Sequence, residues 1–130
     1  MAVAGASPVD PLKGLRVLVV EDETLVAMLI EEYLAELGCV VALSARRVSR
    51  ALEGLKDLEI DAAVLDVNVA GDSVTPVAEL LAQRNVPFVF ASGYGAKGVE
   101  AAWAGRPVIQ KPFAERELRA GLLACLQSKP

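Results

Sequence analysis

The stretch Leu-Arg-Val-Leu-Val-Val-Glu-Asp-Glu at residues 15–23 decides the fold class of this chain. Its first six residues are apolar apart from one arginine and rich in valine, which is typical of a strand buried on both faces. Such strands occur where helices cover a parallel sheet on each side. Because Glu21, Asp22 and Glu23 follow at once, the strand is predicted to end in a group of carboxylates.

Short apolar runs and amphipathic stretches then alternate along the whole chain. Strands are predicted at 15–20, 39–43, 62–67, 86–91 and 107–110. Helices are predicted at 25–37, 46–58, 76–84, 99–104 and 115–126, with 99–104 short and weak, and a loop at 70–73. Pro107 suggests that the last strand lies at an edge of the sheet. This order predicts an α/β fold with a doubly wound parallel sheet of five strands and helices on both faces.

The composition limits the possible functions. The 130 residues suffice for one domain with an aliphatic core, since 54% are hydrophobic and only 5% aromatic. The chain contains no histidine, which excludes His-dependent triads, His zinc sites and a histidine phosphocarrier. With a net charge of −4 and no run of basic residues, no nucleic-acid partner is expected. Cys39 and Cys125 are expected to be reduced core residues, which favours a cytoplasmic location.

The chain is expected to contain a single folded domain. Residues 1–13 are predicted to be a flexible leader, because they lack the basic start and the continuous apolar segment of a signal peptide. Residues 14–128 are predicted to form the domain, with no output domain attached. No apolar run approaches the roughly 20 residues of a membrane span, so no membrane association is expected.

Polar residues stand at the carboxyl ends of the predicted strands, where open α/β sheets bind ligands. They are Glu21, Asp22, Asp66, Ser92 and Lys111. Clustered carboxylates repel one another unless a cation lies between them, and Mg²⁺ accepts such oxygen ligands together with a phosphate oxygen. The lysine and the serine suit two further phosphoryl oxygens. Asp66 is then the nucleophile, and it needs no general base because a carboxylate is already ionised at neutral pH.

Four stretches of this sequence resemble the receiver domain of two-component response regulators, in that family's order and spacing. They are VLVVEDE at 17–23, AVLDVNVAG at 63–71, VPFVFASGYG at 86–95 and VIQKPF at 108–113. The resemblance implies a flavodoxin-like (βα)5 fold with strand order 2-1-3-4-5. It also implies that Asp66 is the phosphoacceptor, Ser92 the switch hydroxyl and Lys111 the phosphate-binding lysine. The implied Mg²⁺ ligands are Glu21, Asp22, Asp66 and the backbone carbonyl of Asn68.

The resemblance further implies a signalling domain rather than an enzyme acting on a separate substrate, and because no output domain is expected, we expect a stand-alone receiver. A sensor histidine kinase or a histidine phosphotransfer protein would supply the phosphoryl group. Output would follow by binding of a partner protein, or the domain would act as a phosphate sink. A monomer or weak dimer is expected, and Asn68 and Tyr94 would flank the water that hydrolyses the aspartyl phosphate.

Two positions depart from the usual pattern of the family. Ser92 stands where threonine is frequent, and Val108 stands where an aromatic residue usually couples the hydroxyl to the rest of the domain. The stretch 90–94 resembles the Phe-Ala-Thr-Gly variant of receivers, which is associated with alphaproteobacterial signalling and HWE-type kinases. Transmission of the signal is then expected to depend on the glycine-rich loop 93–98 and the short helix after it.

Other readings of the same residues remain. Taken singly, the acids could lie at a helix N-terminus or in a loop, and Ser92 and Lys111 could be ordinary turn and surface residues. The chain could be a degenerate receiver used only for binding, or a small flavodoxin-like enzyme or nucleotide binder. The stretch GYGAKG at 93–98 matches GxGxxG, but it lacks a sound following helix and an acid at the next strand end. Trp103 could be a packing residue or part of a partner surface.

Overall fold

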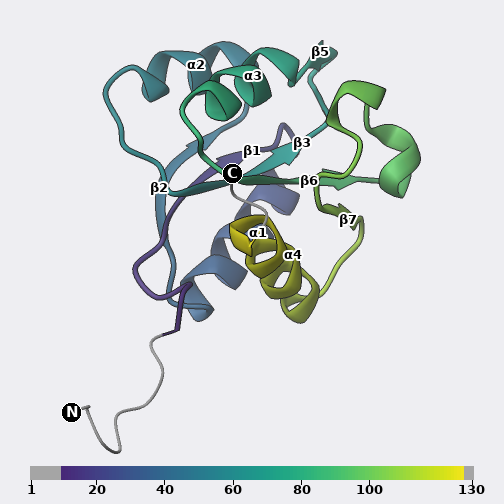
Figure 1. Cartoon of the computed structure of the whole chain (residues 1–130). Helices are drawn as coiled ribbons and strands as arrows, with labels where there is room; N and C mark the ends of the chain where they lie inside the picture. The colour runs from purple at the N-terminus through teal and green to yellow at the C-terminus, as the bar shows by residue number, and fades with distance from the viewer. Residues whose placement is uncertain (1–9, 128–130) are drawn as a thin grey trace, which may run out of the picture.

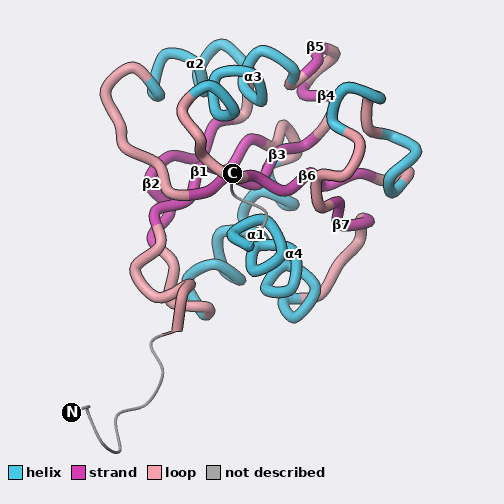
Figure 2. Tube along the Cα trace, viewed as in Figure 1, coloured by secondary structure: helices cyan, strands magenta, loops and turns pink. Residues whose placement is uncertain are grey.

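Five parallel strands form the central sheet of the molecule (Figure 1, Figure 2). The computed structural model describes residues 10–127, so most of the expected leader and residues 128–130 lie outside the described part. The strands are β1 (Arg16–Val20), β2 (Val40–Ala45), β3 (Ala62–Asp66), β6 (Phe88–Ser92) and β7 (Val108–Gln110). Their order is β2-β1-β3-β6-β7. Counted along the chain this is 2-1-3-4-5, which confirms the predicted flavodoxin-like topology.

Helices cover both faces of the sheet, as the apolar strands require. The helices are α1 (Thr24–Glu36), α2 (Val48–Leu55), α3 (Thr75–Gln83) and α4 (Glu115–Gln127). In Figure 1, α2 and α3 lie on one face and α1 and α4 on the other. Along β1, Leu18 and Val20 contribute to the core beneath α2 and α3, whereas Val17 and Val19 contribute to the core beneath α1 and α4. Burial on both faces therefore explains the unbroken apolar run that the sequence shows.

The predicted helix at 99–104 was wrong. The chain between β6 and β7 forms two short 3₁₀ turns, η1 (Gly95–Gly98) and η2 (Ala101–Trp103), so residues 10–127 contain four α-helices rather than five. Gly95 and Gly105, on either side of the predicted helix, have φ angles of 58° and 92°, outside the helical region, and the chain between them is too short for a stable helix. We call residues 95–103 the turn segment.

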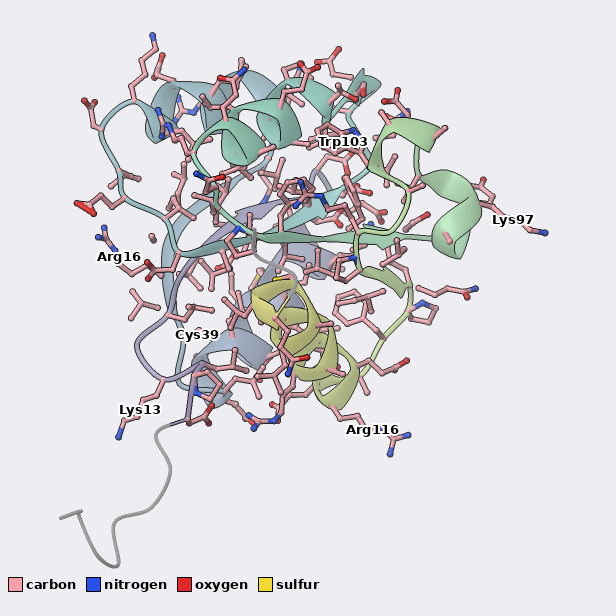
Figure 3. The ribbon with its side chains drawn as sticks, viewed as in Figure 1. Lys13, Arg16, Cys39, Lys97, Trp103 and Arg116 are labelled. Carbon is pink, nitrogen blue, oxygen red and sulfur yellow. The ribbon has the colours of Figure 1, made fainter. Side chains whose placement is uncertain are left out.

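Aromatic packing attaches the turn segment to the sheet. The Trp103 ring centroid lies 5.6 Å from that of Phe88 and 6.4 Å from that of Phe90. The Arg106 guanidinium stacks over the Phe88 ring at 4.5 Å. In Figure 3, Trp103 lies beside α3 while Lys97 extends into solvent. Trp103 is therefore at least a packing residue, which answers part of the question that the sequence left open.

The loop predicted at 70–73 is in part a hairpin. Strands β4 (Asn68–Val69) and β5 (Asp72–Ser73) pair in antiparallel fashion around a turn at Ala70 and Gly71. Both turn residues have positive φ angles, 53° and 89°, as two-residue hairpin turns of this hand require. The hairpin follows β3 directly, so it lies at the carboxyl end of the sheet.

The remaining expectations about the fold concern its edges and its cysteines. Strand β7 lies at an edge of the sheet, as Pro107 suggested. Cys39 and Cys125 are buried free thiols in the core beneath α1 and α4. Within residues 10–127, no helix combines the length and the apolar character needed to span a bilayer.

Candidate functional site

A cluster of three carboxylates lies at the carboxyl end of the two central strands. Glu21 and Asp22 follow β1, and Asp66 is the last residue of β3. The two strands are parallel neighbours with Val20 opposite Leu65, so these acids reach the same edge of the sheet. One carboxylate oxygen from each acid lies within 4.8 Å of the other two. The sequence prediction that these acids come together is therefore correct in geometry.

Lys111 reaches into the cluster from the loop after β7. Its ammonium nitrogen Nζ lies 2.7 Å from Oε1 of Glu21 and 3.3 Å from Oδ1 of Asp66. The backbone N–H of Lys111 donates a hydrogen bond to the carbonyl of Ser92, which fixes the loop against the end of β6. A single cation thus faces two carboxylates that are far apart in sequence.

Burial and charge shift the pKa values of these groups. Burial raises the pKa of Glu21 to about 7, although the hydrogen bond from Lys111 opposes the shift. Burial also raises the pKa of Asp66, again against the opposing charge of Lys111. Burial by itself would lower the pKa of Lys111, but its hydrogen bond to Glu21 and the charge of Asp66 raise it. Burial thus raises the pKa of both carboxyls, while the contacts with these carboxylates raise the pKa of Lys111.

Asp22 is held by a backbone group that the sequence did not reveal. The N–H of Ala70 donates a hydrogen bond of 2.8 Å to Oδ2 of Asp22. Burial raises the pKa of Asp22, but this hydrogen bond and others outweigh burial, so the pKa lies below its ordinary value. The hairpin is itself closed by a hydrogen bond from the Gly71 N–H to Oδ1 of Asn68. The residues of the β4–β5 turn thus hold one carboxylate of the cluster in place.

The Ser92 hydroxyl lies next to the cluster but faces the turn segment. Ser92 ends β6, and the preceding residue, Ala91, is the pairing partner of Asp66. The side chain is 3% exposed, and its Oγ accepts a hydrogen bond of 3.1 Å from the N–H of Tyr94. Within the described chain, no hydrogen bond joins this hydroxyl to Asp66. The structure thus places Ser92 at the same edge of the sheet as the carboxylates, while its hydroxyl accepts a hydrogen bond from the loop that follows β6.

An apolar surface borders the site on the side of α1. Leu25, Met28 and Leu29 are 81%, 55% and 42% exposed, and we call these three residues the α1 patch. A groove of about 280 Å³ adjoins the patch and opens beside Lys111. Its lining is mostly apolar and consists of Glu23, Val26, Leu29, Ile30, Lys111, Pro112 and Phe113. Exposed apolar side chains beside a charged site indicate a surface for a partner.

Comparisons with known proteins agree with this geometry. The family model described as response regulator receiver domain matches residues 17–123. The chain is similar to SdrG from Sphingomonas melonis Fr1, with 43% identity, a TM-score of 0.79 and coverage of 87% of this chain and 97% of that one.

Two further solved structures are similar to the chain. The BeF3-activated conformation of SdrG, from Pseudomonas melonis Fr1, has 45% identity and a TM-score of 0.72, and covers 85% of this chain and 94% of that one. The PhyR receiver domain of Erythrobacter litoralis has 26% identity and a TM-score of 0.76, and covers 91% and 94%. Among curated proteins, none matches the chain.

Proposed function

This chain belongs to the response regulator receiver domain family, and from that premise we propose that it accepts a phosphoryl group on Asp66 in a two-component phosphorelay. The observation that carries the proposal is the position of Asp66. Its carboxylate ends a central strand 3.3 Å from the Lys111 ammonium, beside two further carboxylates. A nucleophile, a cation for the phosphoryl oxygens and a set of metal ligands thus share one sheet edge.

The donor set suits Mg²⁺. Three carboxylates with oxygen ligands close together, in a region where burial raises the cost of their charges, fit a hard divalent cation. In this proposal Glu21, Asp22 and Asp66 hold the ion, together with the backbone carbonyl of Asn68. When bound, the ion supplies positive charge that stabilises the phosphoryl group during transfer.

Side chains of this protein supply the nucleophile and the groups that bind the phosphoryl oxygens. The ionised Asp66 carboxylate attacks the phosphorus of a phosphohistidine, the P–N bond breaks, and the leaving imidazole takes up a proton from solvent. Lys111 is already beside Asp66 and pairs with one phosphoryl oxygen as the negative charge moves onto it. Ser92 donates its hydroxyl to another oxygen once it turns away from the Tyr94 N–H. Asn68 and Tyr94 then flank the path of the hydrolytic water.

The phosphohistidine must lie outside these 130 residues, because they contain no histidine. A sensor histidine kinase or a histidine phosphotransfer protein is the proposed donor. The donor has to reach Asp66, and the α1 patch and its groove are the exposed apolar surface that borders Lys111. We therefore assign donor docking to this surface. Residues 14–128 act as the receiver in this proposal, and a cytoplasmic location stays a prediction.

The proposal is tested with acetyl phosphate and Mg²⁺, followed by intact mass measurement. We expect a gain of about 80 Da, the mass of one phosphoryl group, in the wild type. The gain should disappear in Asp66→Ala and when Mg²⁺ is omitted. Asp72→Ala is the matched control, since Asp72 is an exposed acid in the neighbouring hairpin. Loss of the adduct in Asp72→Ala, or its persistence in Asp66→Ala, would contradict the proposal.

A further inference from the structure

Gly98 closes over the hydroxyl of Ser92. A Cβ atom built at Gly98 would overlap Oγ of Ser92, whereas it would lie 3.5 Å from Cβ of Ser92 and 3.4 Å from Cβ of Tyr94, which are ordinary contacts. The φ angle of Gly98 is not positive, so its backbone conformation is open to any residue. Glycine is therefore required here by the position of one oxygen atom, and by nothing else that surrounds it.

We propose that Gly98 sets the position of the Ser92 hydroxyl and couples that position to the turn segment. In the described structure the hydroxyl lies beneath Gly98, where it accepts the Tyr94 N–H; we call this the parked position. The coupling is steric: the hydroxyl can be parked only while residue 98 has no side chain. The inference rests on the proposed function, in which the hydroxyl turns to a phosphoryl group on Asp66.

Turning of the hydroxyl has two consequences for the turn segment. The hydrogen bond from the Tyr94 N–H is lost, and the space beneath Gly98 is vacated. Gly98 can then move inward, because close-packed interiors do not keep a void of this size without loss of contacts. A small side-chain rotation thereby becomes a backbone displacement. The contact between Gly98 and the Ser92 hydroxyl would then couple the hydroxyl to the rest of the domain, which is the role of the aromatic residue that receivers usually carry at the position of Val108.

The surroundings of the turn segment leave room for such a displacement. A cavity of about 280 Å³ lies between the segment and the start of α3, and Val99, Glu100 and Trp103 line it on the side of the segment. The indole Nε1 of Trp103 is buried and has no hydrogen-bond partner within the described residues. A side-chain hydrogen bond of 2.9 Å, from the Thr75 hydroxyl to Glu100, joins the segment to α3.

The test uses the full chain and the variant Gly98→Ala. The added methyl group excludes the parked position, so the hydroxyl turns towards Asp66 before any phosphoryl group is present. If the turned position is a minor state of about 10% in the wild type, the apparent affinity for beryllofluoride with Mg²⁺ rises on the order of tenfold. Trp103 is the only tryptophan, so its emission reports the environment of the turn segment directly.

Two further variants separate this contact from general damage to the loop. Gly93→Ala is the matched control, because a Cβ there would meet nothing within 4 Å. In the Ser92→Ala background the overlapping oxygen is absent, so Gly98→Ala should leave the urea midpoint and the Trp103 emission unchanged. In the wild-type background, Gly98→Ala should lower the urea midpoint and shift the emission, while Gly93→Ala does neither.

The resting-state measurements need neither metal nor phosphoryl group, so they decide the inference even if the proposed function fails. The proposed function would be contradicted if acetyl phosphate gave no phosphoryl adduct on the wild type. The inference on Gly98 is overturned if its alanine variant perturbs the protein equally with and without the Ser92 hydroxyl. It is also overturned if a phosphorylatable wild type and Gly98→Ala bind beryllofluoride with the same affinity.

Discussion

The ammonium of Lys111 lies 2.7 Å from Oε1 of Glu21, a carboxylate that is only 1% exposed. The same nitrogen lies 3.3 Å from Oδ1 of Asp66. Burial nevertheless raises the pKa of Glu21 to about 7, so the charge of the carboxylate cluster changes near neutral pH. Metal binding and stability are therefore both expected to depend on pH.

Mg²⁺ affinity should increase as the pH rises towards 7 and then level off. The pKa of Glu21 is about 7 in the folded protein, above its ordinary value of 4.5. Protonation of Glu21 therefore stabilises the metal-free fold at low pH. This stabilisation is lost as the pH rises through 7. Because the metal needs the ionised carboxylate, it must displace that proton below pH 7. The check is the rise in melting temperature caused by Mg²⁺, measured at several pH values.

Glu21→Gln provides the control for this pH dependence. The amide keeps the shape of the side chain but cannot titrate, so Mg²⁺ binding should be weaker and its dependence on pH should flatten. Burial also raises the pKa of Asp66, so titration of Asp66 would account for any dependence of Mg²⁺ binding on pH that remains. A wild-type Mg²⁺ effect that is independent of pH would contradict the assignment of Glu21 to the metal site.

Replacement of Lys111 by methionine should change metal binding and phosphorylation in opposite directions. Its ammonium pairs with two of the cluster carboxylates, so its removal should strengthen Mg²⁺ binding. The rate of phosphorylation by acetyl phosphate should fall by on the order of 10²-fold, because a charge aimed at the transferred group is lost. Lys97→Met, at an exposed lysine of the turn segment, is the control, and a parallel loss of both properties would argue for simple misfolding.

Substitutions of Ala70 test the hydrogen bond that holds Asp22. Ala70 has a φ of 53°, and its N–H donates to the Asp22 carboxylate. Ala70→Gly keeps the donor and relieves the left-handed conformation, so Mg²⁺ binding should be retained and stability should rise by at most about 1 kcal/mol. Ala70→Pro removes the N–H and forces a negative φ, so stability should fall by about 2 kcal/mol or more and Mg²⁺ should bind more weakly. Isothermal titration measures Mg²⁺ affinity, and urea unfolding measures stability. If Ala70→Gly and Ala70→Pro bound Mg²⁺ equally well, the role of this N–H would be refuted.

The α1 patch should matter only for protein donors. In Leu25→Ser/Met28→Ser, two exposed apolar side chains are lost without a change in the core, so phosphorylation by acetyl phosphate should stay at the wild-type rate. Transfer from a phosphorylated histidine kinase should become at least about tenfold slower, since central apolar anchors dominate such interfaces. Val40→Ser, at a 51% exposed residue of the edge strand β2, serves as the control. Unchanged transfer in the double variant would place the docking surface elsewhere.

Gly121 should be intolerant of even one methyl group. A Cβ there would lie 2.9 Å from both Cγ1 and Cδ1 of Ile109 and 3.2 Å from Cγ2 of Val89. The helix propensity of alanine favours the change by about 1 kcal/mol, but overpacking costs about 1–3 kcal/mol, so Gly121→Ala should be destabilising by about 1 kcal/mol. Urea unfolding provides the measurement. A raised midpoint would mean that Ile109 moves aside at little cost.

The sequence predicts the sheet well because each buried strand is short, apolar and followed by polar residues. Parallel neighbours must align their carboxyl ends, so the meeting of Glu21, Asp66 and Lys111 follows from topology. The helix at 99–104 was predicted wrongly, because six residues between Gly98 and Gly105 are too few to form a stable helix on their own. The structure instead holds this stretch by packing of Trp103 against Phe88, a contact that no local pattern encodes.

Two features of the site could not have been predicted from residue types. Alanine rarely adopts a positive φ, so nothing in the sequence indicated that Ala70 would direct its N–H at Asp22. The parked position of the Ser92 hydroxyl depends on a side-chain rotamer and on the approach of Gly98, both of which arise only from tertiary structure. In each case the sequence placed the side chain in the candidate site but did not indicate the neighbour that positions it.

The strand order β2-β1-β3-β6-β7 has a consequence for how a preparation of this protein can be assessed. Asp66 ends the middle strand, and its partners in the site come from the strands on either side and from the loop beyond the edge strand. A molecule that has lost any one of these pairings cannot assemble the carboxylates and the lysine together. If the proposed function holds, the fraction of molecules that bind one metal ion or accept one phosphoryl group will equal the fraction that is correctly folded, so that uptake can be used to measure native protein.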